Sequence, residues 1–200
     1  MSRLITNSIR STFASADAIT LDGSGNATFP ANVTCSGTAS GFGGGKLLQV
    51  VSTTRTDTFS EGLGVGALSA DALTVNITPS NANNKIFLTA HVSMGLNNDN
   101  EVNWVFYKAG SLLTAAAGTA DGNRKPRTSG GDVRWSGTHN TTGGQYLDTA
   151  GGTSQITYSV RLGHSANGTK TVYLNRSHTD DNYAYDIRTQ STLTVMEVAV

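Results

Sequence analysis

The stretch from residue 19 to residue 45, ITLDGSGNATFPANVTCSGTASGFGGG, is punctuated by glycines and carries few large apolar side chains. The main ones are Ile19, Leu21, Phe29 and Val33. Ordering one residue costs about 1–2 kcal/mol of backbone entropy, whereas burying one large apolar side chain contributes about 1.5–3 kcal/mol. A segment this poor in apolar residues does not fold alone. We therefore expect a thin stalk of short strands that packs against copies of itself and ends in a glycine-rich joint.

From residue 46 onward the sequence alternates apolar and polar residues, which is the pattern of half-buried strands. The clearest segments are ALTVNIT, KIFLTAHVSM, EVNWVFY, QITYSVRL and TLTVMEVAV. The residues expected to face inward are Leu73, Val75, Ile77, Ile86, Leu88, Ala90, Val92, Met94, Val102, Trp104, Phe106, Ile156, Tyr158, Val160 and Leu162. His91 falls on the opposite face of its strand. About eight strands without a convincing helix predict an all-β fold, an antiparallel jelly-roll-like β-sandwich.

Turn residues predict how some of these strands connect. Lys108–Ser111 is expected to turn the chain back after EVNWVFY, and Asn167-Gly168 predicts a hairpin between QITYSVRL and TKTVYLN. Residues 117–153 are rich in Gly, Thr and Asn, and only DVRWSG within them resembles a strand. We expect a long loop region there, and such a region inside a compact domain is often functional.

Residues 1–18 carry the apolar residues Leu4, Ile5, Ile9 and Phe13. Three of these recur at helical spacing, but the surrounding Ser and Thr are poor helix formers. A short helix and an extended arm that orders on a partner are both open, and in either case these apolar residues are the candidate attachment residues. The sequence thus divides into an arm (1–18), a stalk with its joint (19–45) and a β-sandwich domain (46–200).

Composition excludes several functional classes. The formal net charge is zero and only 14% of residues are charged, so no basic excess favours nucleic acid or an anionic membrane surface. No apolar run approaches the roughly 18 residues of a membrane span. Gly62–Ala67 matches a dinucleotide-binding pattern but lacks its strand–turn–helix context. Asn98–Glu101 and Asp180-Asp181 lack the spacing of a calcium loop. We therefore expect no enzyme, no cofactor and no metal.

The best candidates for a binding contact are aromatic residues set among short polar ones. They are Trp135, His139, Tyr146, Tyr183 and Tyr185. Rigid rings stack on sugars or protein surfaces while neighbouring polar groups form hydrogen bonds, which suits receptor recognition. The alternative is that some of these rings cover the edge of the core or a subunit seam, and the sequence leaves both open.

The run KLLQVVSTTRTDTFS, followed by LTVNITPSNANNKIFLTAHVSMG and by STLTVMEV, resembles the C-terminal domains of bacteriophage tail-fibre and related virion proteins, including those of cyanophages. The preceding AITLDGSGNATFPANVTCSGTASG resembles the short stalk that often comes before such domains. The resemblance extends from about residue 17 to the end, and the weakest part is 95–155.

This resemblance implies a virion location and a homotrimeric fibre or spike. Its N-terminus would attach to other virion proteins of the tail or capsid, and its C-terminal knob would contact a host surface glycan or protein. Because the chain is short for a tail fibre, a head-decoration fibre or a tail connector without a receptor-binding role is the alternative. A glycan depolymerase is disfavoured, because such enzymes need paired carboxylates in a cleft and the acidic residues here fall mostly in turns.

Overall fold

The structure is a computed structural model of the chain and describes residues 6–10, 15–30, 46–135, 137–184 and 186–200. The chain divides between Gly44 and Gly45 into two compact units. Strands dominate both, and among the described residues no helix is long and apolar enough to cross a membrane.

The N-terminal unit contains a small antiparallel sheet in the order β1-β2-β3. Its strands are β1 (Ser8–Ile9), β2 (Ile19–Leu21) and β3 (Ala27–Thr28). Asp22 shapes the turn between β2 and β3, because its Oδ1 accepts hydrogen bonds from the N–H groups of Ser24 at 2.9 Å and Asn26 at 2.8 Å. Ser8 and Ile9 are extended and pair with β2, as in the extended alternative for the N-terminal arm. Leu4, Ile5 and Phe13 lie outside the described residues.

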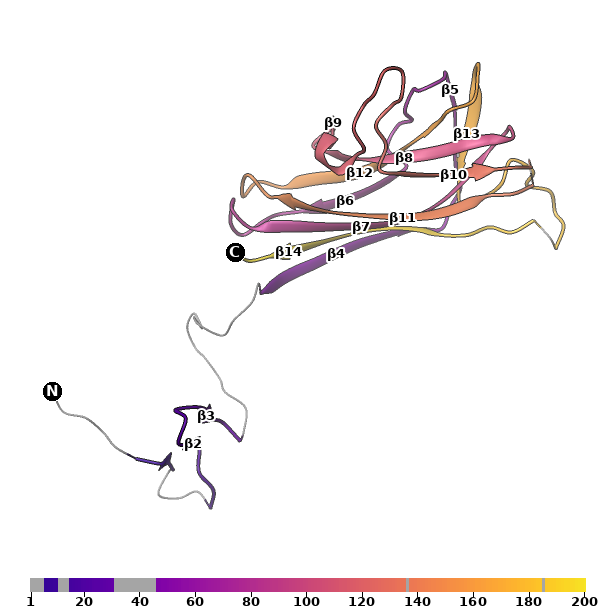
Figure 1. Cartoon of the computed structure of the whole chain (residues 1–200). Coiled ribbons are helices and arrows are strands. Elements are labelled where there is room, and N and C mark those ends of the chain that lie inside the picture. The colour runs from indigo at the N-terminus through magenta and orange to yellow at the C-terminus, as the bar shows by residue number, and fades with distance from the viewer. Residues whose placement is uncertain (1–5, 11–14, 31–45, 136, 185) are drawn as a thin grey trace. The chain divides into compact units, whose positions relative to one another are not determined.

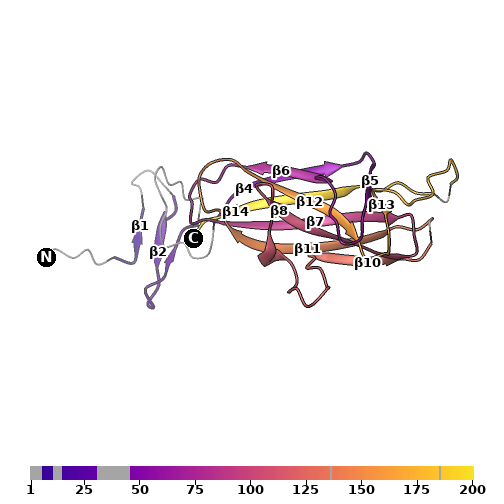
Figure 2. The same cartoon turned by 90° about the horizontal axis from the view of Figure 1, so that it is seen from above.

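The C-terminal unit is an antiparallel β-sandwich with jelly-roll topology (Figures 1 and 2). Its elements are β4 (Leu47–Arg55), β5 (Phe59–Leu63), β6 (Leu73–Ile77), β7 (Lys85–Leu96), β8 (Asn100–Lys108), β9 (Ser111–Leu112), the 3-10 turn η1 (Thr114–Ala116), β10 (Ser129–Val133), β11 (Asn140–Thr149), β12 (Ile156–His164), β13 (Lys170–Leu174) and β14 (Ser191–Val198). One sheet contains the order β4-β14-β7-β11, because β14 and β11 flank β7, and β13 pairs with the end of β7 and with β5. The other sheet runs β6-β12-β8-β10, with the short β9 paired to β8. This order confirms the predicted jelly-roll-like sandwich.

The core lies between these two sheets. The predicted inward-facing residues of β6, β7, β8 and β12 are all buried, while His91 is exposed on the outer face. Trp104 and Phe106 meet edge to face, with ring centroids 4.9 Å apart. The Trp104 indole N–H donates to Thr142 Oγ1 at 2.8 Å, so its polar atom is satisfied inside the core. Val105 is also fully buried, because β8 is covered on both faces.

β11 corrects the expectation of a loop across residues 117–153. Ten residues of that stretch, Asn140–Thr149, pair with Lys85–Met94 of β7. The inward positions of β11 include Thr142, Gly144 and Asp148, which are small or polar, so the hydrophobic alternation that reveals a strand is missing. Gly144 is required there, because a Cβ atom at this position would lie 2.7 Å from the Trp104 ring.

The Asn167-Gly168 turn is also different from the prediction. β12 pairs with β8 and β6, whereas β13 pairs with β5 and β7, so this turn joins strands of opposite sheets and closes no hairpin. Gly168 does have a positive φ, of +74°, which is the backbone conformation that the Asn-Gly pair predicts for a tight turn. A tight two-residue hairpin does form at Ala109-Gly110, where φ is +48° and +77°, between β8 and β9.

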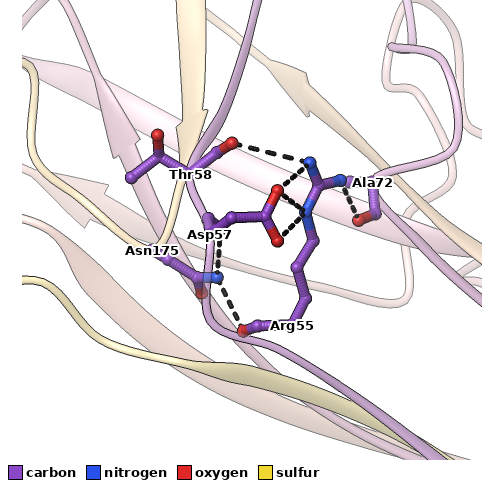
Figure 3. A network of polar contacts seen from close by, with 5 residues as sticks. All are labelled: Arg55, Asp57, Thr58, Ala72 and Asn175. Atoms are coloured by element: carbon purple, nitrogen blue, oxygen red, sulfur yellow. Dashed lines mark hydrogen bonds and ion pairs between the residues drawn. The ribbon is translucent and has the colours of Figure 1, made fainter.

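A buried asparagine fixes the end of β4 (Figure 3). Asn175 Nδ2 donates to the backbone carbonyls of Arg55 and Asp57, each at 2.9 Å. Asn175 Oδ1 accepts from Ser191 Oγ at 2.6 Å. Arg55 in turn binds the Asp57 carboxylate and donates to the Ala72 carbonyl at 2.8 Å. Asn175 has a φ of +63°, a conformation that asparagine tolerates better than most residues. This network ties the turn after β4 to β6 and to the chain entering β14.

Candidate functional site

Two of the predicted contact residues, Trp135 and Tyr183, lie at the same end of the sandwich. Trp135 is in the connection from β10 to β11, and Tyr183 is in the connection from β13 to β14. β10 ends opposite Asn100 at the start of β8, and β13 ends opposite Met94 near the end of β7. The chain enters β4 and leaves β14 at the other end (Figure 2). These two rings therefore belong to the end of the sandwich away from the entry of the chain.

Both residues accept backbone hydrogen bonds from residues that follow them in the same connection. The Trp135 side chain is 74% exposed and Tyr183 is 58% exposed. Beneath Trp135, the Thr138 hydroxyl and N–H donate to the Trp135 carbonyl at 2.8 and 2.9 Å. The N–H group of Asp186 donates to the Tyr183 carbonyl at 3.1 Å. An exposed aromatic ring supplies a large contact area at little entropic cost, because it has few rotatable bonds.

The other predicted contact residues are placed differently. His139 is half-buried just before β11, and this burial lowers the pKa of its imidazole. Tyr146 lies in the middle of β11, where its ring packs against the core, as in the alternative that some rings cover the core edge. Tyr185 lies outside the described residues. The structure thus brings Trp135, His139 and Tyr183 to one end of the sandwich and places Tyr146 away from it.

Of the predicted attachment residues, Ile9 is within the described part of the chain. It lies in β1 and is 46% exposed. Leu21 and Phe29, expected to be stalk residues, are 39% and 45% exposed. Within one chain these apolar side chains remain half in solvent.

The sequence analysis missed an open groove on the outer side of the β8–β12 sheet, at the same end as Trp135. Its volume is about 880 Å³. Val65 and Gly66 of the β5–β6 connection line one side, and the loop before β10, up to Arg127, lines the other. Figure 1 shows both connections rising over β8 and β12. A signal was present in the sequence, since Arg124, Lys125 and Arg127 cluster in a chain with 14 basic residues in all.

An apolar row crosses the outer face of the β4-β14-β7-β11 sheet. Val50 lies opposite Met196, Met196 opposite Phe87, and Phe87 opposite Leu147. Val50 and Leu147 at the two ends are 52% and 53% exposed, and the two central side chains are half-buried. The adjoining row, two residues along, is polar throughout: Ser52, Thr194, Thr89 and Gln145. The apolar row is therefore bounded by polar residues on this side, whereas the row on its other side includes the apolar Leu47 and Val198 beside Lys85 and Thr149.

Comparison with known proteins adds little. No protein-family model and no curated protein matches the chain. Among solved structures, the chain is similar to one of infectious bursal disease virus, Gx strain, at 13% identity and a TM-score of 0.39, over 85% of this chain and 42% of that one. It is also similar to the VP2 subviral particle of infectious bursal disease virus, at 11% identity and a TM-score of 0.39, over 85% and 44%.

The chain therefore spans less than half the length of these two viral chains. Similarity at this level carries no argument about what the protein does. The fold class defined by the strand order is a jelly-roll sandwich with a separate small N-terminal sheet.

Proposed function

We propose that this protein is a structural subunit of a bacteriophage virion, a short trimeric tail fibre or spike whose sandwich contacts the host surface. The observation that carries the proposal is the apolar row of Val50, Met196, Phe87 and Leu147. Single exposed apolar residues are ordinary, but a contiguous apolar row across four strands is typical of a surface that binds protein. The occupant proposed here is a second copy of the chain.

The N-terminal unit supports self-association independently. Its strands are only two or three residues long, and a small sheet of this kind is not stable in water without packing. Ile9, Leu21 and Phe29 would gain about 1.5–3 kcal/mol each on full burial against other copies, less what they already bury. Closed rotational symmetry is the common solution for identical subunits, and the resemblance of the sequence to virion fibres favours a trimer.

The mass of the purified full-length chain tests the assembly. We expect light scattering to give a trimer at micromolar concentration. The double variant Val50→Asp/Leu147→Asp places charges at both ends of the apolar row. It should separate the sandwich domains of the trimer from one another, while the far-ultraviolet circular dichroism spectrum, which reports the fold of each domain, stays unchanged. The matched control Ser52→Asp/Gln145→Asp changes the adjoining polar row and should remain trimeric. A stable wild-type monomer would contradict the proposal.

The location of the protein is tested in the virion. Deleting residues 1–18 removes β1 and the candidate attachment residues, and should leave a folded sandwich that no longer incorporates into particles. Normal incorporation of this deletion would refute attachment through the N-terminus. A full-length trimer that incorporates but does not bind host cells would instead favour the decoration-fibre or connector alternative.

A further inference from the structure

The floor of the groove is formed by polar side chains that are hydrogen-bonded to one another. Asn103, which is 4% exposed, accepts from Arg127 Nε at 2.6 Å through Oδ1 and donates to Ser165 Oγ at 3.3 Å through Nδ2. Glycines flank Asn103 on both neighbouring strands, since Gly130 and Gly163 each pair with it. A Cβ atom at Gly163 would lie 2.8 Å from Asn103 Oδ1, so the glycines leave the room in which Asn103 and the guanidinium meet.

The Arg127 side chain is half-buried, and the hydrogen bonds that its guanidinium donates within the described residues all go to uncharged oxygen atoms. Besides Asn103, it donates to the carbonyls of Gly66 at 3.0 Å and Pro126 at 2.9 Å. Across the described residues it forms no ion pair with a carboxylate. Three of its five N–H groups are thereby used, and one on each terminal nitrogen is left. A guanidinium held by its other donors, with two terminal N–H groups left over, is suited to a bidentate carboxylate.

The other charged residues of the groove restrict which class of anion can bind there. Arg124 is paired with Asp121, whereas Lys125 has no ion pair within the described part of the chain. Glu101 lines the same groove and accepts from Ser165 Oγ at 3.2 Å. One carboxylate facing two unpaired cations disfavours a polyanion such as nucleic acid, whose binding scales with the number of cations. Glu101, Thr119 and Asn123 are, by contrast, suited to bind hydroxyl groups.

We propose that this groove binds a saccharide bearing a carboxylate, with the carboxylate on Arg127 and Lys125 and the sugar hydroxyls on Glu101, Thr119 and Asn123. The volume of about 880 Å³ lies within the ~300–1,000 Å³ range of small-ligand sites. The groove also shares the end of the sandwich with Trp135. The inference names the ligand class of the host contact and in that sense rests on the proposed function.

Calorimetric titration of the full-length protein with trigalacturonate tests the proposal. Its methyl ester is the matched neutral probe, because it keeps the sugar rings and removes the charge. We expect the ester to bind at least about tenfold more weakly, since charge-assisted hydrogen bonds are lost. Arg127→Gln should weaken the binding of trigalacturonate to a similar extent, and Lys125→Gln should weaken it by a few-fold. The control Arg134→Gln, on a side chain that is 84% exposed and does not line the groove, should leave binding unchanged.

Arg127 also holds Gly66 and Asn103, so the Arg127→Gln variant requires a check by circular dichroism. If Arg127→Gln does not fold, the Lys125→Gln variant and the comparison with the ester test the proposal, because neither disturbs the hydrogen bonds of Arg127. The proposal is overturned if trigalacturonate does not bind, if the ester binds equally, or if Arg134→Gln weakens binding as much as Lys125→Gln. Pyrophosphate binding as tightly as trigalacturonate would overturn the saccharide assignment. These outcomes are separate from trimer formation and virion incorporation, which test the proposed function.

Discussion

The buried carboxylate of Glu197 is expected to make the stability of the sandwich strongly dependent on pH. Glu197 lies near the end of β14 and is fully buried. Its Oε1 accepts from Ser80 N–H and Oγ, both at 2.8 Å, and from Asn84 Nδ2 at 2.6 Å. Its Oε2 accepts from Gln49 Nε2 at 2.5 Å. These four hydrogen bonds join the β6–β7 turn to β14 and β4.

The magnitude follows from the shift in the Glu197 pKa. Burial alone raises this pKa, but the hydrogen bonds from Gln49, Asn84 and Ser80 outweigh burial and lower it from 4.5 to about 2. At about 1.4 kcal/mol per pH unit, the ionised carboxylate contributes roughly 3 kcal/mol to the free energy of unfolding at neutral pH. Because the folded-state pKa is depressed, this stability is present above pH 4.5 and is lost as the pH falls towards 2.

Glu197→Gln removes the charge and places an NH₂ group among donors. We expect it to lower the free energy of unfolding by about 3 kcal/mol at pH 7. The difference from wild type should shrink to less than half of this by about pH 3, because the Glu197 carboxyl of the unfolded wild-type chain is then protonated, and folding must release that proton to form the ionised native carboxylate. Urea denaturation of both proteins at neutral and acidic pH measures the difference. The exposed Asp99→Asn is the control and should show little change. A Glu197→Gln difference that stays constant between these pH values would refute the reasoning.

Three further substitutions test other parts of the structure. Asn175→Ala should lower the free energy of unfolding, measured by urea denaturation, by about 2–4 kcal/mol, because two carbonyls lose their hydrogen-bond donor and alanine disfavours a positive φ. An unchanged midpoint of denaturation would argue against a stabilising role of the Asn175 hydrogen bonds. Trp135→Ala should weaken host-cell binding by at least ~2 kcal/mol without changing the melting temperature, whereas retained binding with a destabilised trimer would make Trp135 a packing residue. Gly144→Val should destabilise by about 1–3 kcal/mol through a clash with the Trp104 ring, while Gly143→Val, which has room, serves as the control.

Strands with apolar inward residues could be predicted from the sequence because burial and alternation coincide in them. Ile86, Leu88 and Val92 are an example, and they are buried as expected. β11 was not predicted because its inward positions hold residues such as Thr142 and Gly144, whose small size matches the bulk of Trp104 on β8. The requirement for a small residue is set by a partner distant in sequence, so no local pattern reports it.

In the candidate sites, too, some features could be predicted from the local sequence and others depend on residues that are distant in sequence. The exposure of Trp135 could be inferred from its polar neighbours, but its grouping with Tyr183 depends on strand pairing across the fold. Glu197 shares the inward parity of Leu193 and Val195, which marks it as a buried charge, yet its partner Asn84 is 113 positions away. Arg127 and Asn103 likewise meet through the pairing of β10 with β8. Such contacts require the topology as well as the pattern.

The pairing of β4 with β14 has a consequence for the order of events during synthesis. Ser52 and Thr194, which face each other in this pair, are 142 positions apart. β4 leaves the ribosome long before its partner exists, and Met196 joins the apolar row only when β14 docks between β4 and β7. A nascent chain on a polysome therefore displays an incomplete strip to its neighbours. Under the self-association proposed above, subunits would become competent to associate only after translation has passed β14, and unfinished chains would stay out of the assembly.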